Sequence, residues 1–192
     1  MLSTSISAKA FKALASVATN KFSSRQEYKY VYVCFLPDGC IFFEATDGMI
    51  LVRYLSRSRG TICLPEEKPA REVVVPLPRN FTSLKEAKRL TIVVDEGQAI
   101  VEDDGGNQFT LDFTEATPLP SDQPFKPVFE RAATKPTLCS LSGLARAFKI
   151  LGDIVKGENY GDVNISMYTH GDYHLLLRCG NYLYVLVSPC CD

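Results

Sequence analysis

Residues 41–55, IFFEATDGMILVRYL, decide the fold, because two apolar runs flank the tetrapeptide ATDG at 45–48. Runs of β-branched and aromatic residues that meet at Asp-Gly are typical of two antiparallel strands joined by a tight turn. Glycine allows the backbone to bend where a side chain would clash. The sequence places no histidine beside Asp47, so we interpret Asp-Gly as turn chemistry and expect no enzymatic activity.

The composition predicts a cytosolic protein with a hydrophobic core. Of its 192 residues, 46% are apolar and 22% are charged, which is ordinary for a folded chain of one large domain or of one and a half domains. The chain has no apolar run of about eighteen residues and no signal-like start, so we expect a cytoplasmic location and no membrane partner. Most of the seven cysteines lie in apolar runs, which favours reduced, buried thiols over a disulfide framework.

Three segments of the chain, expected at 1–60, 61–132 and 133–192, follow one plan. Each begins with a short extended piece, continues with an amphipathic helix and ends with three alternating strands. Apolar residues at helical spacing mark the helices of the first and third segments, and Pro78 is a suitable first residue for the second. The repeats predict an α+β protein with antiparallel sheets and with helices on one face.

The solvent-facing stripe of each expected helix carries cations. The net charge is only -1, so local clusters rather than bulk charge would attract a polyanion. On a single helix such a stripe is typical of a solvated face, but three in register would form a basic wall for the phosphates of duplex DNA. No aromatic residues interrupt the stripes, which disfavours base stacking on single strands. The DNA-facing candidates are Lys9, Lys12, Lys85, Arg89, Arg146, Lys149 and Lys156.

Several stretches resemble the bacterial DNA polymerase III β subunit, the sliding clamp, and together they cover nearly the whole chain. The tetrapeptide at 45–48 stands at the position of the clamp's own ATDG hinge, and the closing strand resembles the clamp's last strand. The resembling stretches are SSRQEYKYVYVCFLPDGCIFFEATDG, EVVVPLPRNFTSLKEAKRLTIVVDEGQAIVEDDGGNQFTLDF, PLPSDQPFKPVF and NYLYVLVSP. The resemblance implies the DNA-clamp fold, with a complete clamp-type domain at 1–132 and an additional half-domain at 133–192.

Sliding clamps of this family are rings of twelve half-domains around duplex DNA, and partner proteins insert short peptides into an apolar pocket. The resemblance therefore implies a peptide pocket and a DNA-facing helix layer in this chain. The family's usual His-Arg-Leu after the hinge is replaced by Met49-Ile50-Leu51, which makes the pocket more apolar. The pocket candidates are Thr46, Gly48, Met49, Ile50, Leu51, Pro127, Val128, Leu186 and Ser188.

The expected function is that of a sliding-clamp-like processivity factor for a DNA polymerase, which contacts duplex DNA without sequence preference and binds partner peptides. The first clamp domain and half of the third are missing relative to the family pattern. A homo-oligomer of four copies would therefore be needed for a twelve-repeat ring. A clamp-derived decoy or regulator, which captures clamp-binding peptides without forming a ring, is the alternative.

A small zinc-binding interaction protein is the second alternative. Thiolate and imidazole groups are zinc ligands, and His170, His174 and Cys179 lie close together in the sequence. The chain has no Cys-x-x-Cys pair, and both histidines flank an expected turn, where polar residues are common. We therefore expect no metal and no cofactor.

Overall fold

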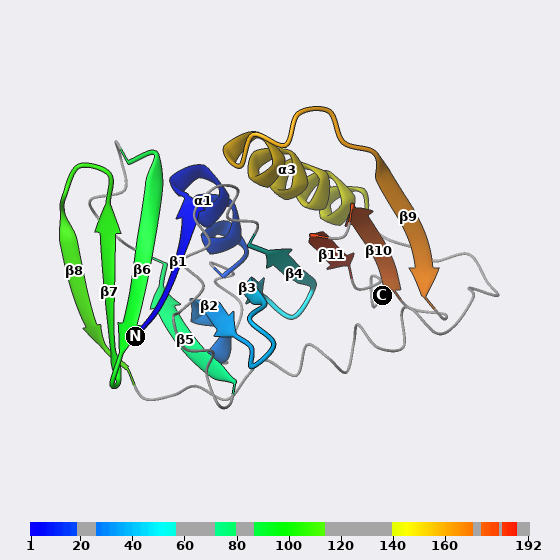
Figure 1. Cartoon of the computed structure of the whole chain (residues 1–192). Coiled ribbons are helices and arrows are strands. Elements are labelled where there is room, and N and C mark those ends of the chain that lie inside the picture. The colour runs from blue at the N-terminus through cyan, green and yellow to red at the C-terminus, as the bar shows by residue number, and fades with distance from the viewer. Residues whose placement is uncertain are drawn as a thin grey trace.

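The structure is a computed structural model that describes residues 1–18, 26–56, 72–79, 87–113, 140–170, 174–180 and 182–187. Within these residues, the fold consists of two antiparallel sheets and two α-helices (Figure 1). Neither of the two α-helices has the length and apolarity needed to cross a membrane. In chain order, the elements are β1 (Leu2–Ser7), α1 (Ala8–Val17), a 3-10 helix (Gln26–Lys29), β2 (Tyr30–Phe35), β3 (Ile41–Thr46), β4 (Ile50–Leu55), β5 (Val73–Pro78), β6 (Arg89–Asp95), β7 (Gln98–Asp103), β8 (Gln108–Asp112), α3 (Leu141–Gly157), β9 (Ile165–His170), β10 (His174–Cys179) and β11 (Leu183–Val187).

The first two repeats interlock by exchanging their first strands. β1 of the first repeat pairs with β6 of the second, and β5 of the second repeat pairs with β2 of the first. One sheet therefore has the strand order β1-β6-β7-β8, and the other sheet begins β5-β2-β3-β4. The expected α+β architecture of antiparallel sheets is confirmed.

The third repeat extends the second of these sheets. Its strands continue the order as β11-β10-β9, because β11 pairs with β4 in antiparallel orientation. α3 lies over this extension beside α1, and the two helices cover the same face of the sheet (Figure 1). The borders expected at 60 and 132 lie outside the described residues, so the division into 1–132 and 133–192 stays a prediction.

Both α-helices start at a serine that caps the first turn. Ser7 Oγ accepts the Ala10 N–H of α1 at 3.0 Å, and Ser140 Oγ accepts the Gly143 N–H of α3 at 2.9 Å. Each cap satisfies an N–H that has no partner inside its helix, a contribution of about 1 kcal/mol. Behind the cap of α1, the apolar stripe expected from the sequence, which includes Phe11, is buried.

Alternation along the strands assigns side chains to the two faces of the seven-stranded sheet. On β2, Val31 and Val33 face the helices and belong to the main core. Tyr32 and Cys34 point to the other face and belong to a separate buried cluster. Apolar contacts therefore cover both faces of the sheet along β2.

Cys40, which was expected to be buried like most of the cysteines, is exposed after the turn that follows β2.

The helices α1 and α3 run antiparallel and approach closely at Gly157. A Cβ atom at Gly157 would lie 2.5 Å from Ser7 Oγ and 3.0 Å from the Ala10 backbone nitrogen. The carboxylate of Glu158, the next residue, accepts the Ser7 N–H and places negative charge at the N-terminus of α1. The absence of a side chain at Gly157 thus lets α3 end against the start of α1.

Replacing Gly157 with alanine should destabilise the protein, because the new methyl group would overlap atoms of α1 that include its backbone. We expect the free energy of unfolding, measured by urea denaturation, to fall by about 1–3 kcal/mol. Gly152→Ala is the matched control, because a Cβ at this position of the same helix meets no atom within 4 Å. The control should gain about 0.5–1 kcal/mol from helix propensity, and equal effects of the two substitutions would contradict the close approach.

Candidate functional site

An apolar row crosses the outer face of the sheet where the first and third repeats meet. Thr46 of β3 and Leu186 of β11 both stand opposite Leu51 of β4. Leu176 of β10 continues the row beyond Leu186, and we call these four residues the seam row. Leu176 and Leu186 are buried, whereas Leu51 is partly exposed. Three residues that the resemblance assigned to peptide binding therefore lie side by side.

The other expected pocket residues lie differently. Ile50 precedes Leu51 on β4, so the pleat turns its side chain toward the helices, where it is 2% exposed and part of the main core. Ile50 therefore lies on the opposite face of the sheet from Leu51, although the resemblance assigned both residues to the pocket. Met49 lies at the end of the β3–β4 turn and is 51% exposed. The described residues do not include Pro127, Val128 or Ser188.

The turn between β3 and β4 is held by the side chains of Thr46 and Asp47. Gly48 has a φ of +87°, a backbone conformation that favours glycine. Thr46 Oγ1 accepts the Gly48 N–H at 3.1 Å and donates to the Ile50 carbonyl oxygen at 2.9 Å. Asp47 Oδ1 accepts the N–H groups of Met49 and Ile50, at 2.9 and 2.8 Å. The Asp-Gly pair therefore forms the expected turn and places Met49 at its exposed end.

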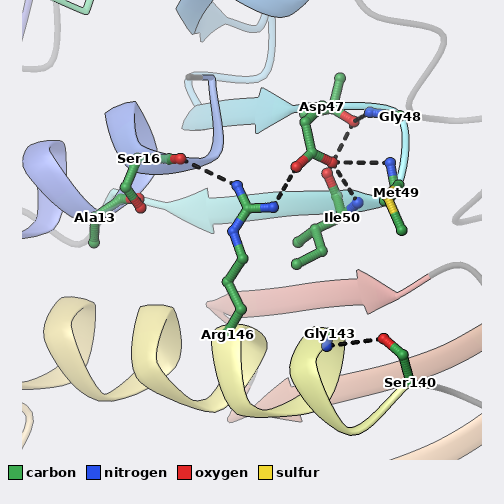
Figure 2. Close-up of polar contacts among 10 residues, drawn as sticks. Ala13, Ser16, Asp47, Gly48, Met49, Ile50, Ser140, Gly143 and Arg146 are labelled. Atoms are coloured by element: carbon green, nitrogen blue, oxygen red, sulfur yellow. Dashed lines mark hydrogen bonds and ion pairs between the residues drawn. The ribbon is translucent and has the colours of Figure 1, made fainter. Parts of the chain in front are cut away.

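An ion pair between a buried carboxylate and a partly exposed guanidinium fastens this turn to α3. Arg146 Nη1 donates to Asp47 Oδ2, and Arg146 Nη2 donates to the Ser16 carbonyl oxygen of α1 at 3.1 Å (Figure 2). The Asp47 side chain is fully buried, and the Arg146 side chain is 36% exposed. Sequence reasoning assigned Arg146 to a DNA-facing stripe, but its charge is paired with a carboxylate of the first repeat.

The charged side chains beside the seam row neutralise each other. Arg53 lies two residues after Leu51 on the same face of β4, and it forms an ion pair with the buried Glu44 of β3. The Arg53 guanidinium also lies 4.5 Å from the centre of the Phe42 ring. This pair therefore places no net charge next to the row, which suits an apolar guest.

Three residues at this site were not identified from the sequence. Tyr28 packs on the turn, since a Cβ at Gly48 would lie 3.1 Å from the Tyr28 Cε2 atom. Leu176 and Tyr184 pack with Leu186 on the outer face. The period-two alternation of β10 and β11 places both residues on that face, so this pattern could have identified them. No comparable pattern in the sequence brings Tyr28 to the turn.

Four lysines of α1 and α3 are exposed on adjacent helices, and we call their surface the helix face. Lys9 and Lys149 share one acid, because Asp153 Oδ1 is 3.7 Å from Lys9 Nζ and Asp153 Oδ2 is 2.8 Å from Lys149 Nζ. Lys12 and Lys156 continue the two stripes at helical spacing and are exposed. The helix face is therefore basic, and Asp153 offsets part of its charge.

Arg89 differs from its expected place on a helix. It is the first residue of β6, where its Nη1 lies 3.7 Å from Glu158 Oε2 and its Nη2 donates to Ser5 Oγ at 3.1 Å. Its charge is therefore shared with the acid that lies at the N-terminus of α1. Lys85, its expected neighbour on that helix, lies outside the described residues.

The residues of the zinc alternative cannot share one ion. His170 and His174 stand opposite each other at one end of the β9–β10 pair, whereas Cys179 stands opposite Ile165 at the other end. The length of β10 between His174 and Cys179 corresponds to roughly 16 Å. Cys179 is also fully buried in the main core. In the part of the chain that the structure describes, no group of three or more metal-ligating residues lies together.

In the described residues, interlocked first strands, a seven-stranded antiparallel sheet and a helix layer on one face form a fold that is similar to that of sliding clamps. The chain is similar to the DNA polymerase III β subunit of Thermotoga maritima, with a TM-score of 0.59 and 12% identity over 99% of this chain and 65% of that chain. The DNA polymerase III subunit β of Pseudomonas aeruginosa matches with a TM-score of 0.61 and 14% identity, over 99% of this chain and 66% of that one. The Helicobacter pylori β clamp, in complex with 3,4-difluorobenzamide, matches with a TM-score of 0.63 and 11% identity, over 98% and 66%.

These comparisons confirm the expected likeness to sliding clamps at the level of the fold. The chain spans about 65% of the length of the Thermotoga maritima subunit. No protein-family model and no curated protein matches the sequence. The sliding-clamp fold is therefore formed here by a sequence that shares only 11–14% identity with those of these three solved clamps.

Replacing Gly48 with alanine should destabilise the β3–β4 turn for two reasons. The positive φ costs about 1–2 kcal/mol for a residue with a side chain, and the new Cβ would press on the Tyr28 ring at 3.1 Å. Gly106→Ala is the control, because Gly106 has a φ of +82° but its Cβ would meet nothing within 4 Å. Urea denaturation should show the larger loss for Gly48→Ala; equal losses would mean that Tyr28 does not hold the turn.

Proposed function

We propose that this protein is a clamp-type binding protein that acts without catalysis. In this proposal the seam row binds peptides of a DNA polymerase or another clamp-binding partner, and the helix face contacts duplex DNA, as in a processivity factor. The observation that carries the proposal is the alignment of Thr46, Leu51 and Leu186, from separate repeats, on one outer face. This is the position at which the resemblance to sliding clamps locates the peptide pocket.

The peptide partner should supply apolar side chains. Leu51 is partly exposed between Thr46 and the buried Leu186, and Met49 stands exposed at the adjacent turn. Methionine is flexible and adapts its shape to different guests, so a leucine or phenylalanine of the partner would find contact at this edge. The Thr46 hydroxyl is already engaged in the turn, which leaves shape and burial as the main sources of affinity.

Duplex DNA is the partner proposed for the helix face. Lysine side chains attract phosphates without reading the base sequence, so binding would be uniform across sequences and sensitive to salt. Arg146 and Arg89 have acidic partners that are buried, which reduces what either can offer to a phosphate. We therefore assign most of the phosphate contact to Lys9, Lys12, Lys149 and Lys156.

A peptide-capturing decoy or regulator is the second candidate. Both sides of the seam row belong to one chain, through β4 and β11, so peptide binding by itself requires no ring. A processivity clamp requires a closed assembly, and four copies of a three-repeat chain would supply the twelve repeats of a clamp ring. Light scattering with and without duplex DNA separates the candidates, because a closed homo-oligomer supports the clamp and a monomer that binds peptide supports the decoy.

Replacing Leu51 with aspartate should weaken peptide binding, because a carboxylate would replace the partly exposed leucine of the seam row. With a fluorescein-labelled peptide that ends in Leu-Phe, we expect a loss of about tenfold or more, which is ~1.4 kcal/mol, by fluorescence anisotropy. Met167→Asp is the control, because Met167 is 56% exposed on β9, outside the row. An affinity that Leu51→Asp leaves unchanged would remove the seam row as the peptide site.

Replacing the four lysines of the helix face with glutamine should lower the affinity for duplex DNA of any sequence. Each phosphate contact that is lost should flatten the dependence of log affinity on log salt by about 0.9. Asp153→Asn is the control, and it should raise the affinity for DNA. This substitution removes the negative charge that offsets the charges of Lys9 and Lys149. Anisotropy titrations of two unrelated duplexes at several salt concentrations measure both effects. A loss confined to one duplex would rule out sequence-blind contact.

A further inference from the structure

The β7–β8 turn of the second repeat shows what an aspartate-capped turn needs. Asp103 Oδ1 accepts the N–H groups of Gly105 and Asn107, and Asp103 Oδ2 accepts the side-chain amide of Asn107, each at 2.9 Å. These hydrogen bonds, with that from the Asn107 side chain foremost, lower the pKa of the Asp103 carboxyl below its usual range. Both carboxylate oxygens are thus satisfied within the turn, and no distant residue is involved in these bonds.

The equivalent turn of the first repeat is built differently. Asp47 Oδ1 accepts two backbone N–H groups, as Asp103 Oδ1 does. Asp47 Oδ2, however, turns to Arg146, which lies 99 residues further along the chain on α3. At Asp103, the side-chain amide of a neighbouring residue is enough to satisfy the second carboxylate oxygen. The turn at Asp47 therefore does not need a distant arginine for its own hydrogen bonds, which indicates that Arg146 has a further role.

Arg146 joins α3, the β3–β4 turn and α1. Arg146 is a residue of α3. Its Nη1 donates to Asp47 in the turn, and its Nη2 donates to the carbonyl oxygen of Ser16 near the end of α1 (Figure 2). A planar guanidinium can hold two acceptors in a fixed geometry, whereas an ammonium group is a point charge on a flexible stem. α3 belongs to the repeat that also supplies β11 and Leu186. Arg146 therefore ties the turn of the first repeat to the body of the third.

We infer that Arg146 is a positioning residue for peptide binding. It holds the β3–β4 turn, which carries Met49, and β4, which carries Leu51, in place against β11, which carries Leu186. The inference rests on the proposed function, because it names the residue that keeps the two sides of the peptide site together. Leu51 follows the turn directly and stands opposite Leu186. Loss of the ion pair between Arg146 and Asp47 would therefore make the β3–β4 turn more mobile, close to the pairing of β4 with β11. Arg146 acts through Asp47 and needs no contact with the peptide.

The test uses the full chain with Arg146→Gln, Arg146→Lys and Asp47→Asn. Peptide affinity is measured with the fluorescein-labelled Leu-Phe peptide, and hydrogen exchange of the Met49 and Ile50 amides is followed by NMR, because both amides donate to Asp47. Arg146→Gln should weaken peptide binding by about tenfold and accelerate the exchange of both amides. Arg146→Lys keeps the charge but offers only one nitrogen for two acceptors, so its effects should be intermediate.

A double variant and a control separate this role from a general loss of stability. Combining Asp47→Asn with Arg146→Gln should add little to the larger single effect, because the two residues act as one unit. Lys88→Gln removes an exposed lysine next to β6 and should change neither measurement. Arg146→Gln should also reduce DNA affinity less than Lys149→Gln, since Arg146 is paired with a fully buried carboxylate, whereas the Lys149 side chain is 79% exposed and its partner Asp153 is 30% exposed.

Each outcome decides the role of Arg146. Unchanged peptide affinity and unchanged amide exchange in both Arg146 variants would overturn it, and so would additive effects in the double variant. If the unaltered protein does not bind the peptide, the proposed function fails, and the exchange rates of Met49 and Ile50 alone decide whether Arg146 holds the turn. If Arg146→Gln does not fold, Arg146→Lys takes its place in the same comparison.

Discussion

Backbone pairing between β4 and β11 is the constraint on which the rest of this structure depends. It joins the first repeat to the third and makes one seven-stranded sheet out of distant parts of the chain. The register of this pairing also decides which side chains are neighbours: Leu51 meets Leu186 on the outer face, and Val52 meets Val185 in the main core. A slip of one residue would turn the seam leucines toward the helices.

The helix layer follows from the same pairing. α1 packs on the strands of the first repeat and α3 packs on β11, so a sheet that is continuous from β4 to β11 brings the two helices side by side. Their buried faces are apolar, but polar groups fasten their ends. Glu158 lies at the start of α1, and Arg146 reaches the carbonyl oxygen of Ser16 near its end. These links orient one helix on the other, which apolar packing alone does not do.

Period and spacing in the sequence were sufficient to predict the fold class and most elements. Apolar alternation predicted the strands on either side of Gly48, and helical spacing predicted α1 and α3, because burial imposes these periods locally. The face of an individual residue was harder, since Ile50 and Leu51 are neighbours and the first residue of β4 decides which one is buried. The ion pair of Asp47 and Arg146 could not be predicted, because no period links residues 99 positions apart.

Because β1 finds its partner in β6, β1 leaves the ribosome long before the segment that completes its sheet. In the growing chain, the edge of β1 stays open until residues 89–95 have been translated. Pairings across such sequence distances slow folding and leave strand edges open to other nascent chains. The first repeat therefore cannot complete its strand pairing by itself, and until β6 emerges the open edge of β1 is a surface that a chaperone would protect.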